Sequence, residues 1–131
     1  MKINTTLLEE QEQALLVQWL ELKGLVFSAI PNSTYTTSYK VKARNTAMGL
    51  RKGLPDILVI VGSKLVFIEL KRTEGGVISS YQRKWITDLH ECNGVIAGVC
   101  YGYEEAKQFI QNILDTGKKP LIAKMKKYGV N

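Results

Sequence analysis

Three residues near the middle of the sequence carry side chains suited to metal-assisted hydrolysis: Asp56, Glu69 and Lys71. Carboxylate oxygens are the ligands that Mg²⁺ and Mn²⁺ prefer. An ammonium group placed beside them stabilises the negative charge that gathers in a transition state. The three residues can act together only if the chain folds back between Asp56 and Glu69.

The stretch between these acids is typical of a β-hairpin. The sequence predicts strands over 56–61 and 64–71, separated by Gly62-Ser63. A two-residue loop with glycine first favours a type II′ turn. Apolar residues fill most of both strands, which indicates that the strands are buried on both faces.

The turn also determines which residues face each other. If Val61 pairs with Lys64, counting outwards places Asp56 directly opposite Glu69 on one face of the sheet. Lys71 follows Glu69 by two residues and shares that face. An isolated Glu69–Lys71 pair would be an ordinary solvated strand end, but opposed carboxylates destabilise a hairpin unless a cation neutralises them. The register therefore predicts an active site.

A fourth acid comes from the first helix, predicted from a capping Thr6 to a stop at Gly24. Glu12 falls within the apolar arc of this helix, formed by Leu8, Leu15, Leu16, Trp19 and Leu20. A carboxylate on a buried face is costly unless it is paired or bound to metal. Glu9 is explained as the capping-box partner of Thr6, and Glu10 points to solvent. Glu12 is the favoured helix-one acid, with Glu9 and Glu10 kept as alternatives.

Two other polar residues allow more than one interpretation. Ser79 and Gln82 have the spacing of a capping box at the start of a helix. Gln82 also precedes the apolar face of that helix, so it could instead reach the site. His90 has no partner at metal or triad spacing and is interpreted as a surface or internally satisfied residue.

The remaining pattern predicts an α/β fold, a mixed central β-sheet flanked by helices. Besides the hairpin and the first helix, the expected elements are a strand over 25–30, a helix over 39–50, a helix over 79–93, a strand over 95–100 and a helix over 104–115. A single domain is expected over 1–131, with a basic C-terminal tail over 118–131.

The charge distribution points to a polyanionic partner. The formal net charge is +6, and one segment carries five cations and no acid: Lys40, Lys42, Arg44, Arg51 and Lys52. The partner could be nucleic acid or an anionic membrane surface; if it is DNA, this segment would hold the flanking phosphates. The role of the basic tail stays open.

Other features of the sequence narrow the class of protein. Cys92 and Cys100 lack zinc-site spacing and are interpreted as inert core thiols. No apolar run approaches the roughly 20 residues of a membrane span. We therefore expect a cytoplasmic, intracellular protein with no membrane partner.

Several segments together resemble a known family. They are Glu12-Gln13, Val17-Gln18-Trp19, Ala29-Ile30-Pro31-Asn32, Gly53-Leu54-Pro55-Asp56, Phe67-Ile68-Glu69-Leu70-Lys71, Ser79 or Ser80 before Gln82, and Val99-Cys100-Tyr101-Gly102. From about Glu9 to Phe109 the chain resembles the PD-(D/E)xK nucleases, and among them the VRR-NUC (virus-type replication and repair nuclease) family.

The resemblance implies a restriction-endonuclease-like core and phosphodiester hydrolysis with Mg²⁺ or Mn²⁺. By position, Asp56 and Glu69 would be metal ligands together with the Leu70 backbone carbonyl. Glu12 would bind the metal directly or through water, and Gln82 would support the site. Lys71 would orient the attacking water and stabilise developing charge.

Stand-alone phage and bacterial members of this family are associated with homodimers that act on branched DNA such as four-way (Holliday) junctions. The resemblance therefore implies a homodimer with branched DNA as partner, and a phage-encoded protein in a bacterial host fits it. The helix containing Trp19 and the helix over 104–115 are the candidate dimer surfaces.

Other functions remain open from the sequence. They are a non-catalytic basic nucleic-acid-binding module, a nuclease acting on flaps or ends, a structural or interaction protein, and a sequence-specific restriction enzyme. The chain offers little room beyond a minimal core for a base-reading domain, which disfavours the last.

Overall fold

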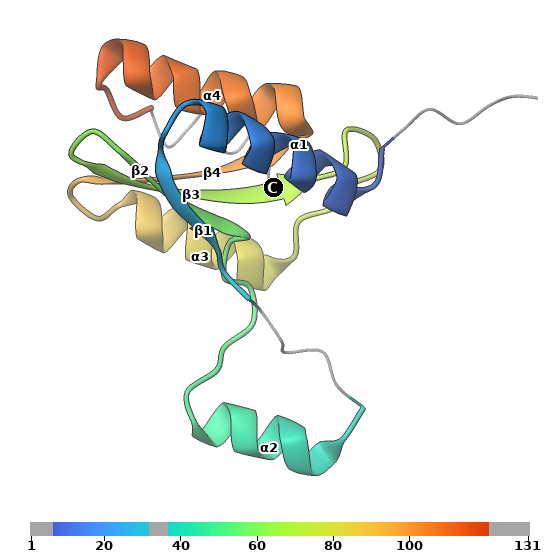
Figure 1. Ribbon diagram of the computed structural model, residues 1–131. Coiled ribbons are helices and arrows are strands. Elements are labelled where there is room, and N and C mark those ends of the chain that lie inside the picture. Colours follow the sequence, from blue (N-terminus) through green and yellow to red (C-terminus); the bar gives the residue numbers. More distant parts are fainter. Residues whose placement is uncertain (1–6, 32–36, 121–131) are drawn as a thin grey trace, which may run out of the picture.

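The computed structural model describes residues 7–31 and 37–120. The elements follow the order α1 (Glu9–Leu22), β1 (Val26–Ala29), α2 (Tyr39–Ala47), β2 (Ile57–Val61), β3 (Lys64–Lys71), α3 (Ser80–His90), β4 (Val95–Tyr101) and α4 (Tyr103–Thr116) (Figure 1). This is the order predicted from the sequence. None of the helices in these ranges is long and apolar enough to cross a membrane.

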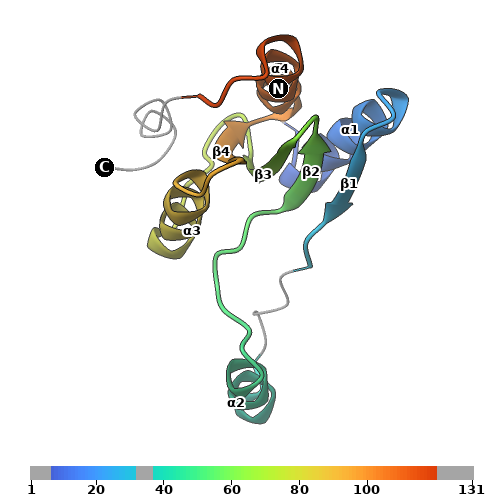
Figure 2. The ribbon, with the colours of Figure 1, turned by 90° about the vertical axis from the view of Figure 1, so that its left-hand side faces the viewer.

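The four strands form one mixed sheet in the order β1-β2-β3-β4. Strands β1, β2 and β3 pair antiparallel, whereas β3 and β4 pair parallel through the crossover helix α3. Helices α1 and α4 lie on one face of the sheet and α3 on the other (Figure 2). The predicted α/β class and mixed sheet are confirmed.

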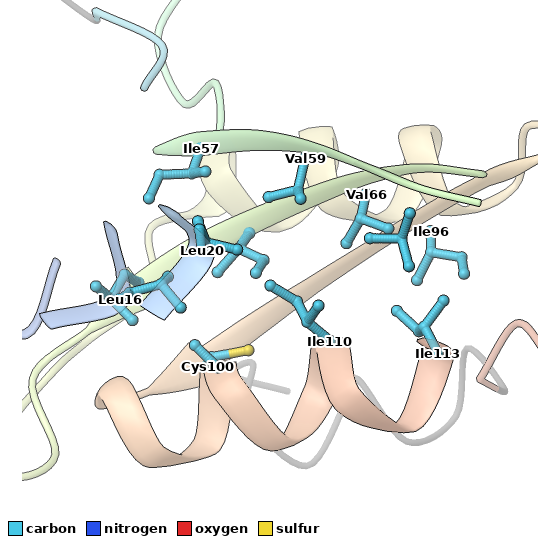
Figure 3. Packing of buried hydrophobic residues seen from close by; sticks show 13 residues of the cluster. Leu16, Leu20, Ile57, Val59, Val66, Ile96, Cys100, Ile110 and Ile113 are labelled. Carbon is cyan, nitrogen blue, oxygen red and sulfur yellow. The ribbon is translucent and has the colours of Figure 1, made fainter. Parts of the chain in front are cut away.

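The main core lies between the sheet and the helices α1 and α4. Helix α1 contributes Leu16 and Leu20, while α4 contributes Ile110 and Ile113 (Figure 3). These side chains meet the inward-facing residues of all three longer strands, among them Ile57, Val59, Val66, Ile68, Leu70, Ile96 and Cys100. This packing holds α1 against the end of β3, where the candidate site lies.

The opposite face of the sheet is only partly covered. Helix α3 packs Ile86 against Ala97 and Val99, which places it over β3 and β4. Farther from α3, Ile60 and Leu65 are exposed. The prediction that both hairpin strands are buried on both faces is therefore wrong for β2 and the start of β3, because one crossover helix covers only two strands.

The predicted hairpin register is confirmed. Val61 pairs with Lys64 and Ile57 with Ile68. Gly62 has a φ of +61°, whereas Ser63 does not have a positive φ, as a type II′ turn requires. Asp56 lies just before β2, and its N–H donates to the Ile68 carbonyl at 2.9 Å. The paired residues end at Ile57 and Ile68, so the direct opposition of Asp56 and Glu69 stays a prediction.

Helix α2 stands apart from the sheet (Figures 1 and 2). It has no buried residue. The Ser38 hydroxyl accepts a hydrogen bond from the Val41 N–H at its start, and Arg51 Nη1 donates to the Thr46 and Leu50 carbonyls beyond its end. The helix stops at Ala47 rather than at residue 50, because Gly49 turns the backbone to a φ of +99°.

His90 is internally satisfied, which is one of the two alternatives considered. Its Nδ1 accepts from the Ala97 N–H at 3.1 Å, so its Nε2 carries the proton and donates to the Pro120 carbonyl at 2.8 Å. Burial lowers the pKa of His90 and keeps the ring neutral. Of the two cysteines, Cys100 is buried as predicted, but Cys92 is exposed because it lies just beyond the end of α3.

Candidate active site

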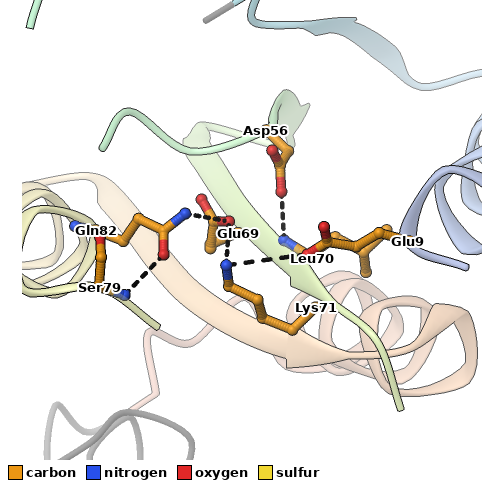
Figure 4. A network of polar contacts seen from close by, with 7 residues as sticks. All are labelled: Glu9, Asp56, Glu69, Leu70, Lys71, Ser79 and Gln82. Carbon is orange, nitrogen blue, oxygen red and sulfur yellow. Dashed lines mark hydrogen bonds and ion pairs between the residues drawn. The ribbon is translucent and has the colours of Figure 1, made fainter. Parts of the chain in front are cut away.

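The three central residues predicted from the sequence converge at one end of the hairpin (Figure 4). Glu69 and Lys71 occupy the end of β3, and Lys71 Nζ lies 3.5 Å from Glu69 Oε2. The Leu70 N–H donates to Asp56 Oδ2 at 2.7 Å, which fixes the Asp56 carboxylate against the strand. Loop geometry supports this position of Lys71, because Gly76 packs so closely that a Cβ there would lie 2.8 Å from the Lys71 Cβ.

The electrostatics of this cluster are unfavourable without a cation. Glu69 is only 2% exposed, and its Oε1 has no hydrogen-bond partner in the structure as described. Burial, followed by repulsion from Asp56, raises the pKa of Glu69 to about 8. Burial also raises the pKa of Asp56, although the bond from the Leu70 N–H opposes the shift. A buried acid with an orphaned oxygen, next to a half-buried second acid, forms a site that a positive ion would stabilise.

The donor set fits a hard divalent cation. Within 7–31 and 37–120, no three side chains of His, Cys, Asp and Glu converge closely enough to hold an ion by themselves. Mg²⁺ commonly binds one or two carboxylates and completes its shell with water and substrate phosphate. Asp56 and Glu69 would supply those carboxylates, and the orphaned Glu69 Oε1 would gain a partner. The role of the Leu70 carbonyl stays a prediction.

Gln82 fulfils both of the roles considered for it. Its Oε1 accepts from the Ser79 N–H at 2.9 Å, while its own N–H donates to Ser79 Oγ at 3.1 Å, which completes the capping box of α3. Its Nε2 donates to Glu69 Oε2 at 3.0 Å. One side chain therefore starts the helix and orients the central carboxylate.

Glu12 is buried as its position on the helix predicts, but its partners lie away from the carboxylate pair. Its Oε2 accepts from the Thr73 hydroxyl at 2.6 Å, and its Oε1 accepts from the Tyr103 N–H at 2.9 Å. The carboxylate thus caps the amino end of α4, where the helix dipole favours negative charge. Gly102 is required there, because a Cβ would lie 2.5 Å from Thr73 Oγ1. The structure thus gives Glu12 two hydrogen-bond partners in the protein, and its binding to a metal, directly or through water, stays a prediction.

Glu9 is the helix-one acid that the structure brings to the site. Its Oε1 lies 3.9 Å from Lys71 Nζ. Burial raises the pKa of Glu9, the Lys71 ammonium opposes this shift, and the Asp56 carboxylate adds to it. The sequence interpretation assigned Glu9 to a capping box with Thr6, which lies outside the described residues. Helix α1 begins at Glu9, and the Leu8 N–H instead donates to Gln11 Oε1. The overlooked signal is that Glu9 precedes Glu12 by three residues, on the same side of the helix.

The two acids of α1 should respond differently to substitution. Replacing Glu12 by Ala leaves the Thr73 hydroxyl and the Tyr103 N–H without their partner, so we expect a loss of about 1–3 kcal/mol in the free energy of unfolding. Replacing Glu9 by Gln should leave this free energy nearly unchanged, because the side chain is half exposed. If the carboxylate pair holds a divalent ion, the same substitution should raise the metal concentration needed to fill the site. Chemical denaturation and metal titrations measure the two effects.

Glu10 provides the matched control, because it is exposed on the same helix turn. Glu10→Ala should change neither quantity. If Glu12→Ala left the free energy of unfolding unchanged but raised the metal concentration required, Glu12 would be the acid of helix α1 that acts on the metal.

The predicted DNA-contacting residues form an exposed basic surface. Lys40, Lys42 and Arg44 lie on α2, and Arg51 and Lys52 follow it. None of the five forms a salt bridge with an acidic residue in the described part of the chain. Their charges are therefore available to an external polyanion.

Comparison with known proteins identifies the family. The model of the VRR-NUC domain matches residues 3–104. The chain belongs to the VRR-NUC family. The resemblance noted in the sequence is thereby confirmed, and membership implies a nuclease-type domain whose substrate is DNA.

Two solved structures support the same fold. The chain is similar to a VRR_NUC domain protein, with 23% identity and a TM-score of 0.65 over 89% of this chain and 96% of the other. It is also similar to a VRR_NUC domain, with 18% identity and a TM-score of 0.53 over 84% of this chain and 97% of the other. No curated protein sequence matches significantly. In this VRR-NUC fold, Asp56, Glu69 and Lys71 lie at the end of the hairpin.

Proposed function

We propose that this VRR-NUC chain is a metal-dependent endonuclease that cleaves branched DNA, in particular four-way junctions, as a homodimer. The observation that carries the proposal is the buried Glu69 carboxylate beside the half-buried Asp56, with an orphaned Glu69 oxygen and Lys71 Nζ 3.5 Å from Glu69 Oε2. No requirement of folding explains a buried carboxylate beside a second, half-buried one, because their burial and mutual repulsion destabilise the strand end that holds them.

The cofactor in this proposal is Mg²⁺ or Mn²⁺ held by Asp56 and Glu69. When bound, such an ion supplies Lewis acidity toward the scissile phosphate and lowers the pKa of water. Gln82 holds Glu69 in place through its Nε2, and the Leu70 N–H holds Asp56. Lys71 Nζ orients the attacking water and donates toward the phosphate oxygens as their negative charge grows.

The basic surface supports DNA as the substrate and suggests how a branch is selected. Helix α2 has no buried residue and stands apart from the sheet, which leaves Lys40, Lys42 and Arg44 accessible (Figure 1). Contacts of this kind hold phosphates and carry no sequence information. Selectivity would therefore depend on the path of the strands around the protein, and a branch point changes that path.

The uncovered face of the sheet supports a homodimer. Val26 pairs with Ile60, and Ile60 pairs with Leu65, so the three form one row across the strands. They are 66%, 43% and 40% exposed. A second copy that covers this row would bury apolar surface and place two sites symmetrically, as two cuts in opposed strands require. The two helices considered from the sequence place their large apolar side chains mainly in the core, so we favour the sheet row over them.

A cleavage panel tests the activity. Duplex, flap, splayed-arm and four-way substrates are incubated with wild-type protein in Mg²⁺, in Mn²⁺ and in a chelator, with Asp56→Asn as the control for contaminating nucleases. We expect metal-dependent cleavage with the four-way junction preferred. Equal cleavage of linear duplex would refute the preference for branched DNA. Preferred cleavage of flaps or ends would make those structures the substrate in place of the four-way junction. Binding without cleavage in either metal would refute catalysis.

The homodimer is tested by light scattering at micromolar concentration. Wild-type protein should have twice the mass of the 131-residue chain. Ile60→Lys places a charge in the exposed row, so it should give a monomer with an unchanged melting temperature. A dimer that persists in this variant would place the interface elsewhere, and a monomeric wild type would remove the homodimer.

A further inference from the structure

A hollow of about 570 Å³ lies between α3 and the connection from α2 to β2. Its wall is aromatic and apolar where Tyr81, Trp85 and Leu50 meet, and its rim carries Arg51, Lys52 and Lys84. The composition is unusual for a surface hollow, because aromatic faces and three cations converge on the same space. Neither the main core nor the carboxylate pair uses these side chains.

A hydrogen bond and close backbone packing fix the shape of the hollow. The Trp85 indole N–H donates to the Lys52 carbonyl at 2.9 Å, which ties α3 to the connecting segment. Gly53 has a φ of +95°, and a Cβ there would lie 2.6 Å from the Tyr81 carbonyl carbon. Glycine thus allows the segment to cross tightly over the first turn of α3. These contacts hold the Trp85 ring and the backbone of Tyr81 in place.

The aromatic surface remains accessible and the local charge is positive. Tyr81 is 58% exposed, and Lys52 Nζ lies 5.6 Å from its ring centroid. Lys84 pairs with Asp88 at 2.9 Å, so one acid offsets one of the three cations. An exposed tyrosine beneath a lysine offers a stacking surface together with a phosphate contact.

The hollow adjoins the carboxylate pair along two separate segments. Tyr81 directly precedes Gln82, whose Nε2 donates to Glu69 Oε2 at 3.0 Å. Lys52 precedes Asp56 by four residues, a stretch of chain that spans at most about 14 Å. A DNA strand whose phosphate lies at Asp56 and Glu69 would therefore pass the hollow within a few nucleotides.

We propose that this hollow holds an unpaired nucleotide of the cleaved strand, with its base on Tyr81 and Trp85 and its phosphate beside Lys52 and Arg51. The inference rests on the proposed nuclease function and adds the feature of the substrate that the enzyme recognises. In a duplex both faces of each base are covered by neighbouring bases, so an aromatic side chain cannot stack on them. A branch, a flap or a frayed end exposes such a face. The hollow thereby selects DNA structure without reading sequence.

Fluorescence of 2-aminopurine provides the direct test. The probe is placed in turn at each unpaired position near the branch of a splayed-arm substrate, and Asp56→Asn protein is used to prevent cleavage. Stacking on an aromatic side chain quenches an unpaired probe, so we expect quenching at one position. Asp56→Asn/Tyr81→Ala should abolish it, whereas Asp56→Asn/Tyr81→Phe, the matched control, should retain it because the ring remains.

Binding titrations give the second readout. Tyr81→Ala in the Asp56→Asn background should bind the splayed-arm substrate roughly 5- to 150-fold more weakly, as loss of one stacked base implies. Affinity for a fully paired duplex should not change, and neither should the melting temperature.

Two results would overturn the proposal: no quenching at any probed position while binding persists, or an equal loss of affinity for duplex and splayed-arm DNA. Both are separate from a failure of the nuclease function, which would appear as absent cleavage by wild-type protein on every substrate in Mg²⁺ and Mn²⁺.

Discussion

Replacing Asp56 by Asn or Glu69 by Gln should abolish DNA cleavage while the fold and DNA affinity persist. Each substitution removes one of two carboxylates available to a cation, and a metal ion contributes several kcal/mol to the stabilisation of such a transition state. We therefore expect single-turnover rates to fall about a thousandfold or more. Affinity for DNA should not weaken, because a negative charge near a phosphate is removed. Quenched-flow cleavage and fluorescence anisotropy measure the two quantities.

Matched substitutions separate this effect from a general loss of charge. Asp115 and Glu104 are exposed on α4, so Asp115→Asn and Glu104→Gln should cleave at the wild-type rate. Metal-dependent cleavage that persists in both Asp56→Asn and Glu69→Gln would show that the catalytic site lies elsewhere.

Without metal, the same Glu69 substitution should stabilise the protein at alkaline pH. The pKa of Glu69 is raised to about 8 in the folded chain, above the value of roughly 4.3 for an exposed glutamate. Between these values the folded chain binds more protons than the unfolded chain, so its stability falls as the pH rises. Glu69→Gln removes this dependence, and its melting temperature should exceed that of wild type at pH 8 but not at pH 5. Added Mg²⁺ should stabilise wild type and have little effect on the variant.

The carboxylate pair was predictable because it depends on local geometry. Gly62-Ser63 sets the turn, the turn sets the register, and the register sets which residues oppose each other. The approach of Asp56 to the end of β3, where the Leu70 N–H donates to its carboxylate, therefore follows from short-range rules. The order of helices and strands was predictable for the same reason, because hydrophobic period and glycine stops act within each element.

The partners of Glu12 were not predictable in this way. Helical period correctly indicated a buried carboxylate that needs a partner, but Thr73 and Tyr103 lie 61 and 91 residues away in sequence. Both a metal and a hydrogen-bonded cap satisfy the same requirement. Only the packing of α1 beside α4 decides between them.

The start of α1 shows how two local signals compete. Thr6 and Glu9 have the spacing of a capping box. Leu8 and Gln11 have the same spacing, but the leucine side chain cannot accept a hydrogen bond as an N-cap. The helix nevertheless begins at Glu9. The shift frees the Glu9 carboxylate, which then lies near Lys71. A difference of two residues at a helix end thus changes which acid reaches the site.

Which strands a helix covers on the second face of the sheet could also not be predicted from local sequence patterns. The apolar run from Ile57 to Val61 is compatible with burial on either or both faces. Where α3 lies depends on the crossover from β3 to β4, and it leaves Ile60 exposed. The exposed row with Val26 and Leu65 is therefore a property of topology, and it is the surface that the proposed homodimer would bury.

Lys71→Ala should slow the chemical step far more than it weakens DNA binding. The Lys71 ammonium is nearly buried and lies 3.5 Å from Glu69 Oε2, so its charge acts at the carboxylate pair and not along the DNA. Removing a preorganised group that stabilises transition-state charge costs roughly 10²–10³-fold in rate. One lysine among many phosphate contacts contributes little to affinity. Single-turnover rates and salt-dependent binding titrations distinguish the two effects.

Lys40→Ala is the matched contrast, because Lys40 is exposed on α2 and distant in the fold from the carboxylates. It should weaken binding on all DNA sequences, lower the slope of log affinity against log salt by about one, and leave the single-turnover rate unchanged. Lys71→Ala should leave that slope unchanged, since the ammonium is compensated by Glu69 and Glu9 and releases no counterion on binding. If Lys71→Ala instead lowers affinity, slope and rate in the manner of a surface lysine, Lys71 is a phosphate anchor and the charge that stabilises the transition state comes from another group.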